Sequence, residues 1–364
     1  MRIAQVSPLY ESVPPKLYGG TERIVSYLTD ELVARGHDVT LFASGDSTTR
    51  AQLISAVPQA LRLGNYIDGN VYNLVQLQQV IERAAEFDII HFHSDYLHFP
   101  STVIGGWPSV TTLHGRLDIT GLDTLYRHFP DIPLISISYN QRKPLAHAGW
   151  VGNVYHGLPE SLYEQGSGKG GYVAFLGRIS PEKRVDRAIA IAGLAGVPIK
   201  IAAKIDRVDK EYFEEKIKHL LSFPHVEFVG EIDESQKGKF LGDAMATLFP
   251  IDWPEPFGMV MIESLACGTP VIAYNNGSVS EVLDHGRSGW IVNSITEGAN
   301  AVKNIHRMSR SACRQAFIER FTVGRMAEDY LTAYTDVVEE YRKVRLPVKS
   351  ELKSGDLSAN FLSA

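Results

Sequence analysis

Two cations follow a short apolar segment in the middle of the chain. Tyr172–Leu176 is typical of a strand, and Arg178 and Lys183 come soon after it. Ser180 is a good helix N-cap and Pro181 a good first helical residue, so we expect a helix to begin here with Lys183 in its first turn. The helix dipole disfavours a cation there unless an anion is bound nearby. The pair therefore predicts a site for an anion such as a diphosphate, with a solvated surface pair as the alternative.

Two glutamates lie on either side of a second expected helix start. We expect this helix to run from Phe257 or Gly258 to Gly268, which puts Glu255 in the preceding loop and Glu263 about a turn and a half inside. Carboxylates accept hydrogen bonds from sugar hydroxyls, and backbone amides at a helix start bind oxygen or phosphate. The arrangement suits a polyhydroxyl ligand, although Glu263 alone could be an exposed helical residue.

Glycines and histidines follow other expected strands. Gly19 and Gly20 precede a helix and would let a ligand approach the backbone closely, or would simply form a loop turn. His114 follows a strand directly, where a lone histidine is more often structural. His91 and His93 share one face of a strand, but no third ligand lies at a readable spacing, so we expect no metal site there. The sequence also has no Asp-x-Asp pair to hold a metal-bridged diphosphate.

Secondary-structure elements must position these residues. The alternation of Val- and Ile-rich runs with segments of helical periodicity predicts parallel βαβ units. The strands expected in a first sheet are Arg2–Ser7, Asp38–Ala43, Phe87–His93, Ser109–Leu113 and Leu134–Ser138. Those expected in a second sheet are Tyr172–Leu176, Ile199–Ile205, Val226–Gly230, Ala246–Pro250, Pro270–Tyr274 and Gly289–Val292. Open α/β sheets bind ligands at the carboxyl ends of their strands, and the residues singled out above fall at such ends.

The domain organisation follows from a glycine-rich segment, Glu164–Gly171, which we interpret as a flexible linker. Its spaced glycines match a dinucleotide-binding fingerprint formally, but a strand follows them where the fingerprint needs a helix, so we reject the match. We expect a first domain over 1–163, a second over 164–324, and a mobile tail over 346–364.

Composition limits the class of protein. The chain has 364 residues, too many for one typical domain, and its hydrophobic content of 44% excludes a largely disordered chain. The net charge of −6 lacks the excess of positive charge that is typical of a nucleic-acid-binding protein. The only two cysteines, Cys267 and Cys313, favour a reducing compartment. With no apparent leader or membrane span, we expect a cytoplasmic protein, with peripheral membrane contact left open.

Taken together, these motifs resemble the family 4 glycosyltransferases, retaining enzymes of the GT-B type. The resemblance extends from Gly19-Gly20 through Phe87–His93, His114, Arg178 and Lys183 to the paired glutamates and the segment 278–290. It implies an α/β fold of two Rossmann-like domains that face a central cleft. The second domain would hold a nucleotide-sugar donor and the first an acceptor. A C-terminal helix at about 325–345 would cross back onto the first domain.

The resemblance also implies roles for individual residues. Arg178 and Lys183 would bind the donor diphosphate, and Glu263 would bind the ribose hydroxyls. Glu255 would hold the donor sugar together with the amides of three consecutive residues, Phe257, Gly258 and Met259. His114 would contact the sugar near the reacting face, and Gly19-Gly20 would approach the diphosphate or the acceptor. The role of His156, where the family often has a different residue pattern, stays open.

The implied reaction is transfer of a hexose with retention, with no metal or other cofactor, from a UDP-sugar or alternatively a GDP-sugar. The acceptor would be a hydroxyl of a glycan, a lipid or a small molecule, in a pocket shaped by the loops Leu9–Tyr18, Gly64–Asn73 and Arg116–Pro130. Two other functions remain open: a nucleotide-sugar epimerase or hydrolase on the same fold, and a non-catalytic sugar-binding protein.

Overall fold

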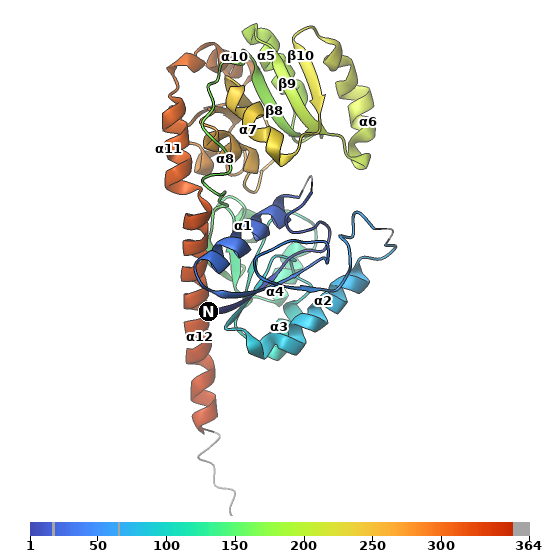
Figure 1. The fold of residues 1–364 in the computed structure, drawn as a ribbon, viewed down its shortest axis with the longest axis vertical. Helices are drawn as coiled ribbons and strands as arrows, with labels where there is room; N and C mark the ends of the chain where they lie inside the picture. Colours follow the sequence, from blue (N-terminus) through green and yellow to red (C-terminus); the bar gives the residue numbers. More distant parts are fainter. Residues whose placement is uncertain (17–18, 65, 352–364) are drawn as a thin grey trace, which may run out of the picture.

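The computed structural model describes residues 1–16, 19–64 and 66–351, which form two α/β domains stacked along the long axis of the molecule (Figure 1). The first domain contains a seven-stranded sheet in the order β3-β2-β1-β4-β5-β6-β7, in which every strand pair is parallel. Its strands are β1 (Arg2–Val6), β2 (Asp38–Ala43), β3 (Gln52–Ser55), β4 (Ile89–Phe92), β5 (Ser109–Thr112), β6 (Leu134–Ser136) and β7 (Trp150–Asn153). The strand order reverses between β1 and β4, which opens a crevice at the carboxyl ends of these two strands.

The second domain repeats this plan with a six-stranded parallel sheet in the order β10-β9-β8-β11-β12-β13. Its strands are β8 (Val173–Arg178), β9 (Ile199–Lys204), β10 (Val226–Gly230), β11 (Ala246–Phe249), β12 (Val271–Tyr274) and β13 (Gly289–Val292). Here the order reverses between β8 and β11. The predicted fold class, two Rossmann-like domains, is confirmed.

Helices connect the strands and cover the sheets. Those of the first domain are α1 (Gly20–Ala34), α2 (Asn70–Arg83), α3 (Phe99–Gly105) and α4 (Leu122–His128). Those of the second are α5 (Val185–Ala195), α6 (Lys210–Tyr212), α7 (Glu234–Asp243), α8 (Met259–Ala266), α9 (Val279–Val282), α10 (Ile295–Lys303) and α11 (Arg310–Arg320). Among the described residues, no helix combines the length and the apolar character that a bilayer crossing needs.

The last helix, α12 (Val323–Glu351), returns to the first domain and runs along it (Figure 1). Met326, Tyr330 and Tyr334 recur on one face of α12 at helical spacing and are fully buried in one apolar cluster, which also contains Ile3 of β1 and Ile24 of α1. The helix is longer than the expected 325–345. Residues 346–351, expected to belong to a mobile tail, continue it, and the rest of that tail, 352–364, lies outside the described residues.

The chain crosses between the domains twice, and the two crossings lie side by side. The amide of Leu158 donates to the carbonyl of Phe321 at 2.9 Å, and the amide of Val323 donates to the carbonyl of Leu158 at 2.8 Å. Leu158 and Phe321 are both fully buried. These paired segments join the domains; the first precedes the expected linker Glu164–Gly171, and the second lies just before α12.

The glycine-rich segment Glu164–Gly171 is not the flexible linker that its composition predicts. The amide of Gly166 donates to the carbonyl of Cys267 at 3.0 Å, and that of Gly168 donates to Gly242 at 3.0 Å. Arg310 donates to the carbonyl of Gly166 at 2.9 Å. Small residues are needed here because the segment lies directly against backbone of the second domain: an added Cβ on Gly166 would approach Gly242 to 2.2 Å.

Two strands of the first sheet, β3 and β7, were not predicted. Both lie at edges of the sheet and are only partly buried, so their sequences lack the continuous apolar run of an inner strand. All six strands expected in the second sheet are present within a residue or two of their predicted ends.

Candidate functional site

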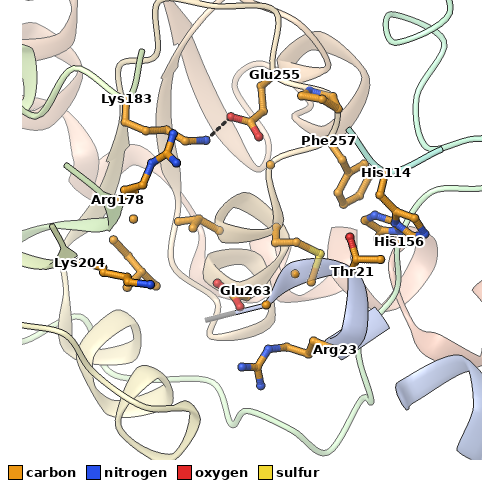
Figure 2. A pocket seen from close by; sticks show the side chains of 18 of the residues that line it. Thr21, Arg23, His114, His156, Arg178, Lys183, Lys204, Glu255, Phe257 and Glu263 are labelled. Atoms are coloured by element: carbon orange, nitrogen blue, oxygen red, sulfur yellow. Dashed lines mark hydrogen bonds and ion pairs between the residues drawn. The ribbon is translucent and has the colours of Figure 1, made fainter. Parts of the chain in front are cut away.

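A cavity of about 440 Å³ lies between the two domains. Its walls come from the carboxyl ends of β8 and β9, the start of α8, the start of α1 and the loop after β5. Figure 2 shows side chains from both domains pointing into this space. All ten residues singled out from the sequence line it: Gly19, Gly20, His114, Arg178, Lys183, Glu255, Phe257, Gly258, Met259 and Glu263.

Arg178 ends β8 and is surrounded by carboxylates. It forms ion pairs with Glu182, with Asp206 at 3.6 Å and with Asp209 at 3.3 Å. Burial raises the pKa of Asp209, although the charge of Arg178 opposes that shift. These acidic neighbours hold the guanidinium at the carboxyl end of the strand, where it lines the cavity.

Lys183 lies in a turn before α5, which corrects the helix start expected at Ser180 and Pro181. The amide of Lys183 donates to the carbonyl of Ser180 at 3.2 Å, and α5 begins only at Val185, after Arg184 with a φ of 53°. The signal at Ser180 is misleading because the chain makes one tight turn there and then reverses into the left-handed region. Lys183 therefore lies in the turn before the helix and not in its first turn.

Lys183 and Glu255 form an ion pair across the cavity, drawn as a dashed line in Figure 2. The indole of Trp253 also donates to the Glu255 carboxylate at 2.9 Å, and the ammonium of Lys183 lies 5.2 Å from the centre of the Trp253 ring. The side chains of Lys183 and Glu255 are only 20% and 11% exposed. A partly buried pair of this kind has both members available to a ligand, the cation for an oxyanion and the carboxylate for hydroxyls.

The start of α8 faces the same space. Gly258 is the residue before the helix and has a φ of 81°, in the left-handed region that favours glycine. The first amides of α8, beginning with Met259, have no partner within the helix and can bind an oxygen atom. The side chain of Phe257 is buried at 2% exposure, so this residue contributes backbone to the cavity while its ring packs against His156.

Glu263 lies inside α8, as expected, and is not an exposed helical residue. Its side chain is 4% exposed and accepts a hydrogen bond from Lys237 at 2.7 Å. Lys237 also pairs with Glu234 at 3.3 Å, and Glu234 pairs with Arg23 of the first domain. Burial lowers the pKa of Lys237, but the carboxylates of Glu263 and Glu234 outweigh it and raise the pKa above its ordinary value. This ion-pair chain links α8 and α7 to α1 across the cleft.

Gly19 and Gly20 lie at the start of α1, where both line the cavity. An added Cβ on Gly19 would come within 2.8 Å of Pro15, whereas one on Gly20 would meet nothing within 4 Å. The carboxylate of Glu22 lies in the same first turn and is buried, which raises its pKa. Because a carboxylate already occupies this helix start, the glycines here offer room for a ligand more than they offer an anion site.

His114 follows β5 and joins a group of buried histidines. Its Nε2 lies 2.9 Å from Nδ1 of His93, and its ring stacks on that of His156 with 5.2 Å between centres. Burial lowers the pKa of His114 to about 3 and those of His93 and His156 well below the ordinary value. These rings are therefore neutral at physiological pH.

His91 and His93 have protein partners on their ring nitrogens. His91 lies within hydrogen-bond distance of Tyr334 and Thr112, and His93 within that of Gln5 and His114. Among the residues that the structure describes, no group of three or more His, Cys, Asp or Glu side chains is arranged to hold a metal ion.

Sequence reasoning did not identify several side chains of the cavity. Lys204 was recoverable, because it ends β9 as Arg178 ends β8. Arg23 and Lys237 lie within helices and reach the cavity only through the facing of the two domains, so no local pattern marks them. Trp253 lies in a loop, and only its packing on Lys183 reveals it. His156, whose role the sequence left open, also lies in a loop and stacks on His114.

Comparison with known sequences matches the two halves of the chain separately. Residues 18–148 match the family model described as Glycosyltransferase Family 4, and residues 164–319 match the one described as Glycosyl transferases group 1. Among curated proteins, a phosphatidyl-myo-inositol mannosyltransferase of Mycobacterium leprae is 24% identical, and the alignment covers 94% of this chain and 97% of the relative. A glycogen synthase of Mycobacterium tuberculosis is also 24% identical, with 96% of this chain and 98% of the relative covered.

Solved structures share the fold. A glycosyltransferase involved in avilamycin A biosynthesis superposes with a TM-score of 0.73 at 24% identity, with 93% of this chain and 98% of that chain covered. The Anabaena protein HepE, in complex with UDP and glucose, superposes with a TM-score of 0.71 at 18% identity, with 92% of this chain and 100% of that chain covered.

Proposed function

Since this chain belongs to the GT4-type glycosyltransferases of the GT-B fold, we propose that it transfers a hexosyl residue from a nucleoside diphosphate sugar to a hydroxyl acceptor, with retention at the anomeric carbon. The observation that carries the proposal is the content of the interdomain cavity. Cations and carboxylates of the second domain, among them Arg178, Lys183, Glu255 and Glu263, line it together with the open start of α8, opposite the start of α1 and His114 of the first domain.

The second domain supplies the groups that a donor needs. Arg178, Lys183 and the first amides of α8 would hold the diphosphate, since charge-assisted hydrogen bonds and helix N-termini both favour oxyanions. Glu263 would accept from the ribose hydroxyls, and Glu255 from hydroxyls of the transferred sugar. The cavity volume of about 440 Å³ lies in the range of small-molecule sites, which are of the order of 300–1,000 Å³.

Catalysis would rest on charge stabilisation. As the bond from the anomeric carbon to the diphosphate oxygen breaks, negative charge grows on the leaving group, where Lys183 and Arg178 stabilise it. We propose a front-face route: the acceptor oxygen bonds to the anomeric carbon on the face that the diphosphate leaves, and the acceptor proton passes to a departing phosphate oxygen. Glu255 is already engaged by Lys183 and Trp253, which suits a carboxylate that orients the sugar better than a free nucleophile.

For the donor we propose a UDP-sugar. The fold neighbour HepE was crystallised with UDP and glucose, which makes UDP the first nucleotide to test and GDP the second. For the acceptor we propose a hydroxyl of a glycan, a lipid or a small molecule. The names of the two curated relatives, a phosphatidyl-myo-inositol mannosyltransferase and a glycogen synthase, refer to a lipid and a glycan.

The first-domain side of the cavity is where the acceptor would enter. Of the loops expected to shape it, 9–18 contributes Glu11 and 116–130 contributes Arg116. Glu11 pairs with Arg62 at 3.0 Å, and burial raises the pKa of Glu11. Residues 17–18 and 65 of the expected acceptor loops lie outside the described residues.

The test is a thermal-shift screen with UDP, GDP, ADP and their sugars, because a ligand that binds only the native state raises the melting temperature. We expect the largest rise with UDP or a UDP-sugar. The best donor is then incubated with candidate acceptors, and the anomeric configuration of the product is read by NMR. Nucleotide release or sugar isomerisation that needs no acceptor would favour the hydrolase or epimerase instead, and binding of free sugar alone would favour a sugar-binding protein.

A further inference from the structure

A continuous chain of hydrogen bonds connects the cavity to the C-terminal helix through the core of the first domain. We call it the histidine relay, and it consists of His114, His93, Gln5, Tyr334, His91 and Thr112. Its members come from β1, β4, the end of β5 and α12. Five of the six are 2% exposed or less, and His114 alone reaches the cavity.

The half of the relay nearer the cavity has three links. Nε2 of His114 lies 2.9 Å from Nδ1 of His93. Nε2 of His93 lies 2.8 Å from the side-chain oxygen of Gln5, and the side-chain nitrogen of Gln5 donates to the hydroxyl of Tyr334 at 3.0 Å. Gln5 is thus the junction at which strand β1 joins the histidines to α12.

The remaining links continue into the core. The hydroxyl of Tyr334 lies 2.6 Å from Nδ1 of His91, and Nε2 of His91 lies 2.7 Å from the hydroxyl of Thr112. Thr112 in turn donates to the hydroxyl of Tyr330 at 3.1 Å. The rings of His91 and His93 pack with their centres 3.9 Å apart, so the two halves of the relay also support each other by contact.

The orientation of Gln5, supported by the hydrogen bond that Thr112 donates to Tyr330, sets where the protons of the relay lie. Its oxygen can only accept, so Nε2 of His93 must carry a hydrogen. A neutral imidazole has one N–H, which leaves Nδ1 of His93 as an acceptor and requires a hydrogen on Nε2 of His114. On the other side, Tyr334 receives the amide proton of Gln5 and gives its own to Nδ1 of His91, which then donates from Nε2 to Thr112.

This arrangement of hydrogens leaves one hydrogen-bond acceptor without a partner at the cavity. With its hydrogen on Nε2, the neutral ring of His114 has a lone pair on Nδ1, and that atom is buried with no hydrogen-bond partner among the described residues. A buried acceptor without a donor costs free energy, so a ligand that supplies a donor to this atom recovers that free energy on binding. Only an O–H or N–H group can do so, whereas a phosphate oxygen cannot. The ring of His156 stacks on a face of His114, whereas the Nδ1 lone pair lies in the plane of the His114 ring.

We propose that Gln5, His93 and Tyr334 are positioning residues that hold His114 in its Nε2–H tautomer, so that its Nδ1 accepts a hydrogen bond from a hydroxyl of the donor sugar. The proposal rests on the proposed transfer from a nucleotide sugar. It gives α12 a part in the reaction as well as in the fold, because Tyr334 orients the amide that sets the tautomer. Tyr334 and Gln5 touch no substrate and act only through His114.

The first test reads the tautomers in the ligand-free protein, so it does not depend on turnover. Protein with ¹⁵N-labelled histidine is examined by NMR, and His91, His93 and His114 are assigned by comparison with single His→Gln variants. We expect all three rings to carry hydrogen on Nε2 and none on Nδ1. A hydrogen on Nδ1 of His93 or His114 would overturn the proposal even if the enzyme transfers sugar.

The second test is a double-mutant cycle of transfer rates between Gln5→Leu and His114→Leu. If Gln5 acts through His114, we expect Gln5→Leu to lower the kcat of the wild-type enzyme by about tenfold, which is the effect of one hydrogen bond in the transition state. In the His114→Leu background, the same substitution should lower kcat little further. Tyr334→Phe serves where Gln5→Leu does not fold, with Tyr126→Phe as the matched control for loss of another buried phenol. Additive losses, or an equal loss in Tyr126→Phe, contradict the proposal. Absence of transfer with every nucleotide sugar, with the expected tautomers intact, refutes the proposed function only.

Discussion

Lys183 and Glu255 show how one ion pair can serve two parts of a ligand. In the ligand-free arrangement the ammonium and the carboxylate neutralise each other beside Trp253. When a diphosphate sugar binds, the ammonium gains phosphate oxygens and the carboxylate gains sugar hydroxyls. The pair keeps both side chains in place before binding, so less conformational entropy is lost on binding.

At this scale we predict the effect of Lys183→Ala. The substitution removes a cation from the leaving group and leaves Glu255 without its partner, so kcat/KM for the donor should fall about 100-fold, or ~2.7 kcal/mol. Steady-state kinetics at varied donor concentration measure it. The control is Lys218→Ala, a lysine of the same domain paired with Glu214 on the surface, which should leave kcat/KM unchanged. An unaltered rate in Lys183→Ala would remove Lys183 from the site.

The starts of α5 and α8 illustrate how an element can place a functional group by where it begins. The left-handed residue Arg184 ends the turn that carries Lys183, and Gly258 turns the chain so that the first amides of α8 face the cavity. Both helices begin without a side-chain cap. At α8 this leaves the amides available to a ligand, in place of a Ser or Asp oxygen that would occupy them.

The element-scale prediction concerns Gly258→Ala. A Cβ there would lie 2.8 Å from Met261 and 3.1 Å from Phe249, at a φ of 81° that costs an alanine about 1–2 kcal/mol. We expect a lower melting temperature and a higher KM for the donor, because the amides at the start of α8 shift.

The matched control is Gly286→Ala, with a φ of 83° and nothing within 4 Å of the added Cβ. It should lower the melting temperature through backbone strain and leave the KM for the donor as in wild type. Equal KM values in the two variants would show that the start of α8 takes no part in donor binding.

At the scale of the whole molecule, the first domain buries neutral histidines in its core, and this couples stability to pH. Burial lowers the pKa of His98 and His114 to about 3, and those of His91, His93 and His156 well below the ordinary value. Once unfolded, these side chains bind protons below about pH 6.5. The unfolded state then binds more protons than the folded state, so the stability of the fold decreases as the pH falls.

We therefore predict that the free energy of unfolding falls between about pH 6.5 and pH 5, by up to about 1.4 kcal/mol per pH unit for each histidine that stays neutral. Urea denaturation at a series of pH values measures it. His98→Gln should make the decrease less steep by about one histidine, whereas the exposed His306→Gln should not change it. A free energy of unfolding that is constant over this range would mean that these histidines titrate in the folded protein.

The sequence by itself determined the two-sheet architecture, the approximate ends of the inner strands and ten of the residues that line the cavity. These follow from local rules: apolar runs make buried parallel strands, and ligands bind where such strands end, so Arg178, Glu255 and His114 could be located without coordinates. These rules did not predict the edge strands β3 and β7, and they predicted a flexible linker where the segment Glu164–Gly171 is fixed. The conformation of each depends on the residues that pack beside it.

Only the tertiary structure decided which groups meet. It paired Lys183 with Glu255 and Lys237 with Glu263, brought Arg23 across the cleft, and joined His114 to Tyr334 through Gln5. Hydrogen bonds and ion pairs form over about 3 Å between residues that lie from tens to hundreds of positions apart, and no local pattern encodes which of them meet. The strand-end rule thus indicated where the chemistry lies, and the packing of the two domains and α12 set its charges and its protons.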